Sequence, residues 1–551
     1  MNRRSFIGSG IGLGAMTAGS LMGGRLAKAL GEESHAMPGA MVETSAGKIR
    51  GAKLADGKVQ CFKGVPYGAS TAGSGRFLPP AKPQPWASVR ETVAYGMRAP
   101  QLDSQFHGAV PPEVEVTDPG GPMGEDCLVL NLWTPSVGRG HKRPVMVWLH
   151  GGGYTTGSGA FTIYDGTELA RKHDAVAITI NHRLGVFGYL YLAELGGEKY
   201  AQASNVGMLD IVAALEWVRD NAEAFGGDPG NVTIFGQSGG GGKVSTLMAM
   251  PSAKGLFHRA IVESGAAVRG APKEVATKSA TAFMAKLGLQ PNQVDQLQQM
   301  PMDQLLQAMG AMTGNGMPGS GAGLVLAPVV DGSTLPVNPF DPVAPAISKD
   351  IPLLIGTVET EVTFFPGQQL DPIDEANLHA RVKGFVRKAS DEQVDQLIAA
   401  YRAGRPKASN TDLYLIIASD ATFRAGVVTE AERKAAPGNA PVYQYYFTWR
   451  SPVRDGKLRT FHTLEIPFVF DNVDGAKSMT GDGQDRYALA SKISGAWVAF
   501  ARTGNPNHPG LPDWPAFDTT RRATMILNDE CKAVDDPYGD AQRMLRALQS
   551  A

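Results

Sequence analysis

The stretch Gly236-Gln237-Ser238-Gly239-Gly240 follows a short apolar run over 231–236 and leads into a segment with a helical pattern. It fits G-x-S-x-G, the pattern in which a serine stands on a tight turn between a strand and a helix. Glycines two residues on either side of the serine allow the close backbone approach that such a turn needs. The turn exposes the hydroxyl and directs the positive end of the following helix toward the reacting atoms. The stretch therefore predicts a nucleophile, Ser238, at the end of a strand in an α/β sheet.

Around this stretch, short apolar runs alternate with helical patterns along most of the chain. Such alternation is typical of a large, mostly parallel central sheet flanked by helices. The runs that predict buried strands are 144–150, 175–181, 231–236, 259–264, 352–356 and 442–447, and helical spacing of apolar residues predicts a helix over 209–225. The Gly- and Pro-containing segments 100–122 and 310–323 are predicted loops of the kind that shape substrate sites. Because no interdomain linker is evident, residues 30–551 are predicted to form one α/β domain.

A second glycine-rich segment, His150-Gly151-Gly152-Gly153-Tyr154, comes at the end of the run over 144–150. Glycines at such a strand end can turn backbone N–H groups toward the oxyanion that forms when a nucleophile attacks a carbonyl. The N–H of the residue after the nucleophile serves the same site. We therefore expect an oxyanion hole made of the N–H groups of Gly152, Gly153 and Gly239. Taken alone, the segment also fits a plain glycine-rich turn.

A serine hydroxyl needs a base within hydrogen-bond reach to act as a nucleophile near neutral pH. The order Ser, acid, His expected for this architecture leaves four of the ten histidines as candidates: His258, His379, His462 and His508. His462 lies in a loop that leads into an apolar run late in the chain, whereas His379 and His508 lie in polar surroundings. We therefore expect His462 to be the base.

The acid that orients this base must lie between the nucleophile and the histidine, at the end of a strand. Glu359 and Glu361 both follow the apolar run over 352–356. Such an acid fixes the imidazole tautomer and stabilises the imidazolium in the transition state. Spacing alone does not separate the two glutamates.

The first residues have the features of an export signal. The pair Arg3-Arg4 precedes a weakly apolar, glycine-rich stretch, which is typical of a twin-arginine signal and predicts a periplasmic or secreted protein. Ala27-Lys28-Ala29 predicts cleavage after residue 29, and Ser34-His35-Ala36 offers a second site as late as residue 36. No segment has the roughly 18 apolar residues needed to cross a bilayer, so no stable membrane insertion is expected.

Composition narrows the function further. The chain has 551 residues, with 52 Lys and Arg against 53 Asp and Glu and no dense basic run, so nucleic-acid binding is not expected. Three cysteines, Cys61, Cys127 and Cys531, are too few for a disulfide framework in a chain of this length. They are expected to be free, with one bridge between Cys61 and Cys127 as the alternative.

Together these motifs resemble the type-B carboxylesterases, the cholinesterase-like branch of the α/β-hydrolases, and in particular its exported bacterial and para-nitrobenzyl-esterase-like members. Further segments similar to that family are 62–67, 124–135, 181–188, 225–229 and 497–506. The resemblance covers nearly all of the chain after the signal. It implies the α/β-hydrolase fold and a serine esterase mechanism that needs neither a metal nor an organic cofactor.

The resemblance also bears on the acid. The family segment after the corresponding strand usually ends in Asp-Glu-Gly, and its glutamate aligns with Glu361. Thr360 and Val362 replace the neighbours here, so Glu359 remains the alternative.

Other charged positions follow from the same resemblance. It implies two structural ion pairs, Arg50 with Glu125 and Arg183 with Asp210. Many relatives carry glutamate before the nucleophile, where this chain has Gln237. The missing negative charge argues against a preference for cationic, choline-like substrates.

The sequence thus predicts a serine carboxylesterase with the triad Ser238, Glu361 and His462, which hydrolyses a small-molecule ester through an acyl-enzyme. Uncharged esters with aryl or short alkyl groups are the substrates that the resemblance implies. Two alternatives are hydrolysis of amides or carbamates by the same triad and a non-catalytic binding protein on the same scaffold. The sequence makes no prediction of oligomeric state.

Overall fold

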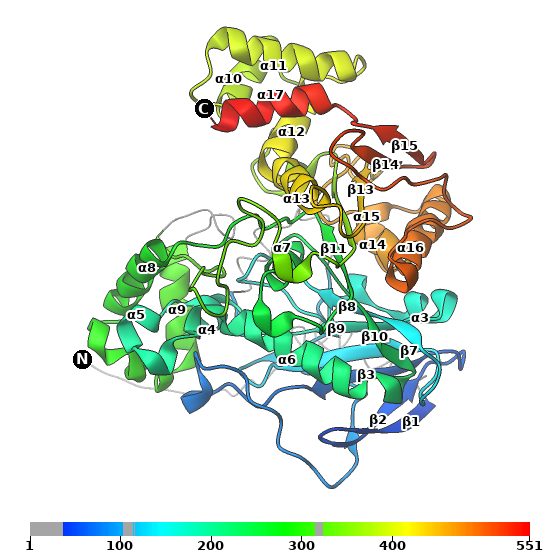
Figure 1. The fold of residues 1–551 in the computed structure, drawn as a ribbon. Helices are drawn as coiled ribbons and strands as arrows, with labels where there is room; N and C mark the ends of the chain where they lie inside the picture. The colour runs from blue at the N-terminus through cyan, green and yellow to red at the C-terminus, as the bar shows by residue number, and fades with distance from the viewer. Residues whose placement is uncertain (1–36, 103–113, 115, 314–322, 551) are drawn as a thin grey trace, which may run out of the picture.

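The computed structural model describes residues 37–102, 114, 116–313 and 323–550 (Figure 1). The predicted signal, 1–29 with its second cleavage site at residue 36, lies outside the described residues, as do 103–113 of the first predicted loop and 314–322 of the second. Residues 310–313 belong to the last turn of a helix, α9 (Met302–Thr313).

The centre of the fold is a 13-stranded sheet. Its strands run in the order β1 (Met37–Thr44), β2 (Gly47–Lys53), β3 (Gln60–Pro66), β7 (Val129–Thr134), β9 (Val176–Ile180), β8 (Arg143–Leu149), β10 (Gly227–Gln237), β11 (Arg259–Glu263), β12 (Leu353–Val358), β13 (Val442–Phe447), β14 (Ala523–Leu527) and β15 (Lys532–Asp535), with β4 (Arg90–Glu91) beside β2. Along this order, neighbouring strands from β9 to β14 are parallel, whereas the pairs from β1 to β9 and the pair of β14 and β15 are antiparallel. Strand β4 is parallel to β2. The α/β-hydrolase fold predicted from the sequence is confirmed.

Each predicted strand is present, and β13 begins and ends where the apolar run does. The predicted helix at 209–225 is α6 (Val206–Asn221). Strands buried on both faces read as continuous apolar runs because neither face meets water. In β8, Val145, Val147 and Leu149 belong to one core while Met146 and Trp148 belong to the other. The two cores therefore lie on opposite faces of the sheet.

Helices cover both faces (Figure 1). Helix α6 and helix α7 (Gly239–Leu247) pack on one face, and α3 (Thr167–His173) and α16 (Asp485–Thr503) pack on the other. Further α-helices are α4 (Gly185–Tyr189), α5 (Ala193–Gly196), α8 (Lys273–Lys286), α13 (Ala425–Ala435), α14 (Ile466–Val469) and α15 (Lys477–Thr480). In the described part of the chain, no helix is both long and apolar enough to cross a membrane.

Four helices form a group beyond one end of the sheet (Figure 1). This helical cluster consists of α10 (Glu375–Lys383), α11 (Asp391–Gly404), α12 (Asn410–Ser419) and α17 (Gly539–Ser550). It has an apolar core of its own, which also contains Val362. The cluster therefore reaches the segment that directly follows β12.

One of the two predicted ion pairs is present, and the other is wrong. Arg183 and Asp210 are both buried, and Arg183 Nε donates to Asp210 Oδ2 at 2.8 Å. Arg50 pairs instead with Glu91 at 2.9 Å, because β4 lies beside β2 with these two residues in register. The partner of Glu125 is Arg76, whose Nε donates to Oε2 at 2.6 Å.

The cysteines carry no bridge. Cys61 and Cys127 are buried free thiols, and Cys531 is a partly exposed one. Burial raises the pKa of the Cys61 and Cys127 thiols above the usual range. The expectation of free cysteines is confirmed.

Candidate active site

Ser238 stands on a sharp turn between β10 and α7. Its backbone has φ 58° and ψ −126°, a strained conformation for a residue with a side chain. The flanking glycines are required by space, because a Cβ on Gly236 would lie 2.6 Å from the Leu149 carbonyl oxygen and one on Gly240 1.9 Å from the same atom. The G-x-S-x-G stretch therefore packs directly against the end of β8 and presents Ser238 at the start of α7.

The segment after β8 is held through its carbonyl groups. The Gly151 carbonyl accepts from His150 Nδ1 at 2.9 Å, and the Gly152 carbonyl accepts from the backbone N–H of Thr156 at 3.1 Å. Gly152 and Gly153 have φ of 83° and 61°, the left-handed region that favours glycine. Because N–H and C=O point in opposite directions across a trans peptide, the N–H groups of Gly152 and Gly153 point away from these bonds.

Glu361 and His462 form a buried pair. Glu361 begins a 3-10 turn (Glu361–Phe364) directly after β12. Its Oε2 lies 2.5 Å from His462 Nδ1, and its Oε1 accepts from the Val358 N–H at 3.1 Å. A histidine that donates from Nδ1 to a carboxylate keeps Nε2 free to accept a proton. The arrangement suits a base oriented by an acid.

The backbone clamps this pair together. The Thr460 N–H donates to Thr360 Oγ1 at 3.0 Å, and Thr360 Oγ1 donates to the Thr460 carbonyl at 3.0 Å. The His462 N–H donates to the Glu361 carbonyl at 3.3 Å. The segment that carries the acid and the loop that carries the histidine are thereby joined on both sides of the pair.

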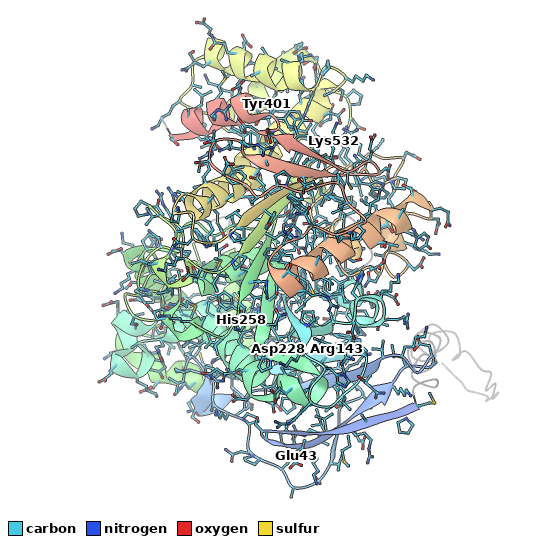
Figure 2. All side chains as sticks on the ribbon, turned by 45° about the vertical axis from the view of Figure 1, so that its right-hand side comes forward. Glu43, Arg143, Asp228, His258, Tyr401 and Lys532 are labelled. Carbon is cyan, nitrogen blue, oxygen red and sulfur yellow. The ribbon has the colours of Figure 1, made fainter. Side chains whose placement is uncertain are left out.

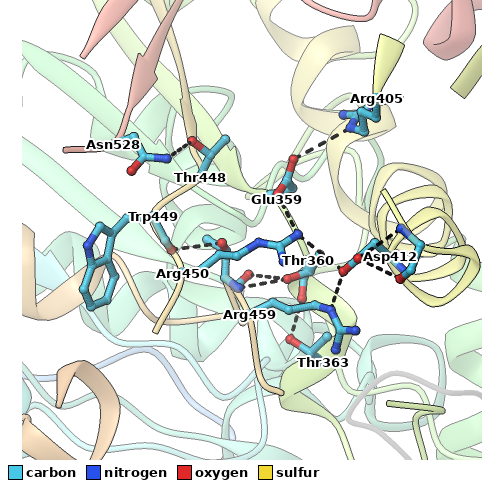
Figure 3. Close-up of polar contacts among 12 residues, drawn as sticks. Glu359, Thr360, Thr363, Arg405, Asp412, Thr448, Trp449, Arg450, Arg459 and Asn528 are labelled. Carbon is cyan, nitrogen blue, oxygen red and sulfur yellow. Dashed lines mark hydrogen bonds and ion pairs between the residues drawn. The ribbon is translucent and has the colours of Figure 1, made fainter. Parts of the chain in front are cut away.

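Glu359, the alternative acid, points elsewhere (Figure 3). Its Oε1 lies 3.7 Å from Arg405 and its Oε2 4.0 Å from Arg450. Burial raises the pKa of Glu359, although both arginines lower it. The structure therefore brings Glu361 to His462 and places Glu359 in a separate network of charged side chains.

The other candidate histidines lie away from Ser238. His258 directly precedes β11, near Asp228 and Arg143 at the starts of β10 and β8 (Figure 2). This is the amino-terminal edge of the parallel strands, the opposite end from Ser238. His379 lies on α10, and His508 lies in a loop where its Nε2 is 2.9 Å from the Lys492 carbonyl oxygen.

A cavity of about 440 Å³ brings the expected site residues together. Ser238, His462, Gly152, Gly153 and Gly239 all line it. Much of the remaining wall is apolar, with Phe161, Ile163, Phe364, Phe365, Phe423, Ala266 and Ala267. Among the described lining residues no carboxylate occurs, and Arg269, which pairs with Asp341 at 2.7 Å, carries the one permanent charge.

Gln237 lies against the His462 ring. Its Nε2 is 3.2 Å from both ring nitrogens. An amide nitrogen in the ring plane at this distance would collide with the carbon atom between the two ring nitrogens. The Gln237 amide therefore lies over the face of the ring. No direct hydrogen bond joins the Ser238 hydroxyl to His462 among the contacts of the described residues. Bonds between a nucleophile and its base are often long until substrate is bound.

Two contributors to the site were not anticipated from the sequence. Phe423, whose ring centroid is 4.8 Å from that of His462, lies on a π-helical turn (Asp420–Arg424) between α12 and α13. Such turns occur frequently at functional sites, but no sequence pattern marks this one. The second is Lys243, the one charged residue in α7, whose other residues are glycine, valine, serine, threonine and leucine. That isolation is a signal that sequence reading could have used.

Comparison with known proteins gives the family. The carboxylesterase family model matches residues 38–544. The para-nitrobenzyl esterase of Bacillus subtilis (strain 168) is 36% identical over 510 residues, which cover 92% of this chain and 98% of the relative. The phenmedipham hydrolase of Pseudarthrobacter oxydans is 36% identical over 499 residues, which cover 89% of this chain and 95% of the relative.

Solved structures agree. A Geobacillus stearothermophilus carboxylesterase matches with a TM-score of 0.78 at 36% identity, over 92% of this chain and 99% of that one. The family model, the two relatives and this solved structure each match most of the described residues. The chain belongs to the carboxylesterase family, as a type-B carboxylic ester hydrolase with the α/β-hydrolase fold.

Proposed function

We propose that Ser238 is the nucleophile of this carboxylesterase, His462 its base and Glu361 the acid that orients the base. Ser238 Oγ attacks the ester carbonyl carbon while His462 Nε2 takes the hydroxyl proton. The N–H groups of Gly152, Gly153 and Gly239 stabilise the resulting oxyanion. His462 then gives its proton to the alcohol oxygen as the C–O bond breaks, which leaves an acyl-enzyme. A water molecule, deprotonated by His462, releases the carboxylic acid and restores Ser238.

The observation that carries this proposal is the buried contact of 2.5 Å between Glu361 and His462, on the same cavity as a serine with strained backbone at a helix start. The test is nitrophenol release from p-nitrophenyl acetate and butyrate by the wild type and Ser238→Ala. Ser245→Ala, on the same helix but outside the cavity lining, is the matched control. We expect kcat to fall by about 10⁴-fold or more in Ser238→Ala alone.

Labelling gives an independent check. Diethyl p-nitrophenyl phosphate should release one equivalent of nitrophenol and leave a phosphoryl group on Ser238, located by peptide mass spectrometry. A phosphoryl group on another serine, or full activity in Ser238→Ala, would refute the nucleophile assignment.

We propose uncharged esters with aryl or short alkyl groups as the substrate class. The apolar wall and the absence of carboxylates from the described lining support it. Whether amides or carbamates are also cleaved is tested with p-nitroacetanilide and a phenyl carbamate in the same assay. Turnover of either compound faster than that of the ester would make that activity the leading one.

We also propose that the protein is exported by the twin-arginine route to the periplasm or beyond, on the basis of Arg3 and Arg4 and the stretch that follows them. Esterase activity in cell fractions tests this. Changing both arginines to lysine should keep the activity in the cytoplasm, and unchanged fractionation would refute the proposal.

A further inference from the structure

Lys243 is a buried lysine whose amine contacts the glycine-rich segment His150-Gly151-Gly152-Gly153-Tyr154. Its side chain is fully buried on α7, five residues after Ser238. Its Nζ donates to the His150 carbonyl at 3.0 Å and to the Gly153 carbonyl at 2.8 Å, and it lies 5.3 Å from the centre of the Tyr154 ring. No described carboxylate forms an ion pair with it. Burial of an unpaired charge is costly, so a structural filler at this position would be better served by an apolar side chain.

The two carbonyls that Lys243 binds lie at the two ends of the glycine-rich segment. Between them are the carbonyls of Gly151 and Gly152, which bond to His150 Nδ1 and to the Thr156 N–H. All four carbonyls from residue 150 to 153 thus accept hydrogen bonds, and the N–H groups of Gly152 and Gly153 point away from the bonded carbonyls of Gly151 and Gly152. Lys243 supplies the first and the last of these four anchors.

Lys243 also connects this segment to the helix that carries the third donor. A Cβ on Gly239 would lie 2.2 Å from the Gly153 carbonyl oxygen, so the start of α7 and the segment are in direct contact. We propose that Lys243 is a positioning residue that fixes the N–H groups of Gly152 and Gly153 relative to Gly239, and so sets the geometry of the oxyanion hole. This inference rests on the proposed role of those three groups.

The ionisation state of Lys243 is compatible with this role. Burial lowers its pKa to about 7. A neutral amine keeps two N–H groups, enough for both carbonyls, so the two bonds survive loss of the proton. The pKa of the neighbouring His150 is lowered to about 3, by burial first and by Lys243 second. His150 is therefore neutral near pH 7 and retains one ring N–H for the Gly151 carbonyl.

The test compares Lys243→Met and Lys243→Ala with Lys434→Met in the full-length enzyme. Lys434 is an equally buried lysine on α13 whose Nζ donates to the Lys349 carbonyl at 2.8 Å, and it does not line the cavity. Methionine keeps the volume of Lys243, and alanine leaves room for water beside the two carbonyls if methionine is not tolerated. For each variant, we would measure kcat and KM with p-nitrophenyl butyrate. We would also measure inhibition by an alkyl trifluoromethyl ketone, which forms a tetrahedral adduct.

We expect kcat to fall by about 10- to 1,000-fold in both Lys243 variants, within the range for loss of an oxyanion donor, with KM changed less than about threefold. Affinity for the ketone should fall by the same factor as kcat/KM, because the tetrahedral state alone needs the aligned donors. Lys434→Met should keep wild-type kcat. Lys243→Gln, which retains donors on a shorter side chain, should recover part of the loss.

The proposal is overturned if either folded Lys243 variant keeps kcat within twofold of Lys434→Met, or if the loss lies in KM and leaves ketone affinity unchanged. Ser238→Ala in the same assay separates this from failure of the proposed mechanism. If Ser238→Ala is active, the mechanism itself fails. If Ser238→Ala is inactive while Lys243→Met is normal, only the role of Lys243 is lost.

Discussion

Two glutamates that stand two residues apart have different surroundings. Glu359 extends β12 by donating its N–H to the Phe447 carbonyl, and its side chain meets Arg405 and Arg450. Glu361 begins the 3-10 turn, and its carboxylate turns toward His462. Because the chain changes from strand to turn between the two glutamates, their side chains point in different directions. We therefore expect them to have different roles.

The pair Glu361→Gln and Glu359→Gln tests that separation. Glu361→Gln keeps the shape but removes the charge that fixes the imidazole tautomer, so we expect kcat on p-nitrophenyl butyrate to fall by about 10³- to 10⁴-fold. Glu359→Gln, which does not touch the histidine, should keep kcat within about threefold. A larger loss in Glu359→Gln than in Glu361→Gln would reverse the assignment.

Gln237 supports a prediction about substrate charge. A neutral amide against His462 offers no attraction to a cationic ester, and no described carboxylate lines the cavity. We expect the neutral ester 3,3-dimethylbutyl butyrate to exceed its cationic isostere butyrylcholine in kcat/KM by at least about tenfold, measured by pH-stat titration. Gln237→Glu should narrow the ratio. Equal rates for the two esters in the wild type would contradict the prediction.

At the scale of elements, strands were easier to predict than the parts that complete the site. Continuous apolar runs mark β8 to β13 because both faces of these strands are buried, and glycines mark the turn at Ser238 because a Cβ would collide there. The π-helical turn that brings Phe423 to His462 has no such signal, since it depends on how α12 and α13 are joined in space. Arg50 was assigned the wrong partner for the same reason, because the position of β4 beside β2 is a tertiary fact.

Helix α13 carries one buried carboxylate, Glu430, and one partly exposed carboxylate, Glu432, and the two have opposite effects of pH on stability. Ser245 on α7 donates to Glu430 at 2.8 Å, and burial raises the pKa of Glu430 to about 8. The folded state therefore holds a proton that the unfolded state releases above about pH 4.5. The contribution of Glu430 to the free energy of unfolding is therefore greatest below that pH. It decreases by about 1.4 kcal/mol per pH unit as the pH rises toward 8.

Glu430→Gln should remove this slope. Relative to the wild type, its free energy of unfolding in urea should rise steadily from pH 5 to pH 8. Glu432→Gln is the matched control two residues away. Burial alone would raise the pKa of Glu432, but hydrogen bonds from Arg546 and Arg522 outweigh it and lower the pKa. Loss of the Glu432 carboxylate charge should therefore destabilise the protein near neutral pH. If the free energies of unfolding of the two variants change with pH in the same way, the assignment for Glu430 is refuted.

At the scale of the whole molecule, the described residues form three main apolar cores, two on the faces of the sheet and one in the helical cluster. The cluster is connected to the candidate site at two points. Ser419 at the end of α12 accepts from the Val362 N–H at 3.2 Å, next to Glu361, and the π-helical turn that follows α12 carries Phe423. Loosening of the cluster is therefore expected to disturb the acid and the histidine before the sheet unfolds.

Leu545, buried on α17 in the core of the cluster, allows this order to be measured. Leu545→Ala should cost about 2–5 kcal/mol locally, whereas Arg543→Ala on the exposed side of the same helix should cost little. The tryptophans all lie outside the cluster, at 86, 133, 148, 217, 449, 497 and 514, so their fluorescence follows the sheet while residual esterase activity follows the site. In Leu545→Ala the temperature of activity loss should fall by several degrees more than the fluorescence transition, because the cluster opens first and carries Phe423 and the Val362 contact with it. If both readouts shift equally, the cluster and the sheet unfold as one cooperative unit, and the two contacts do not transmit local opening to the site.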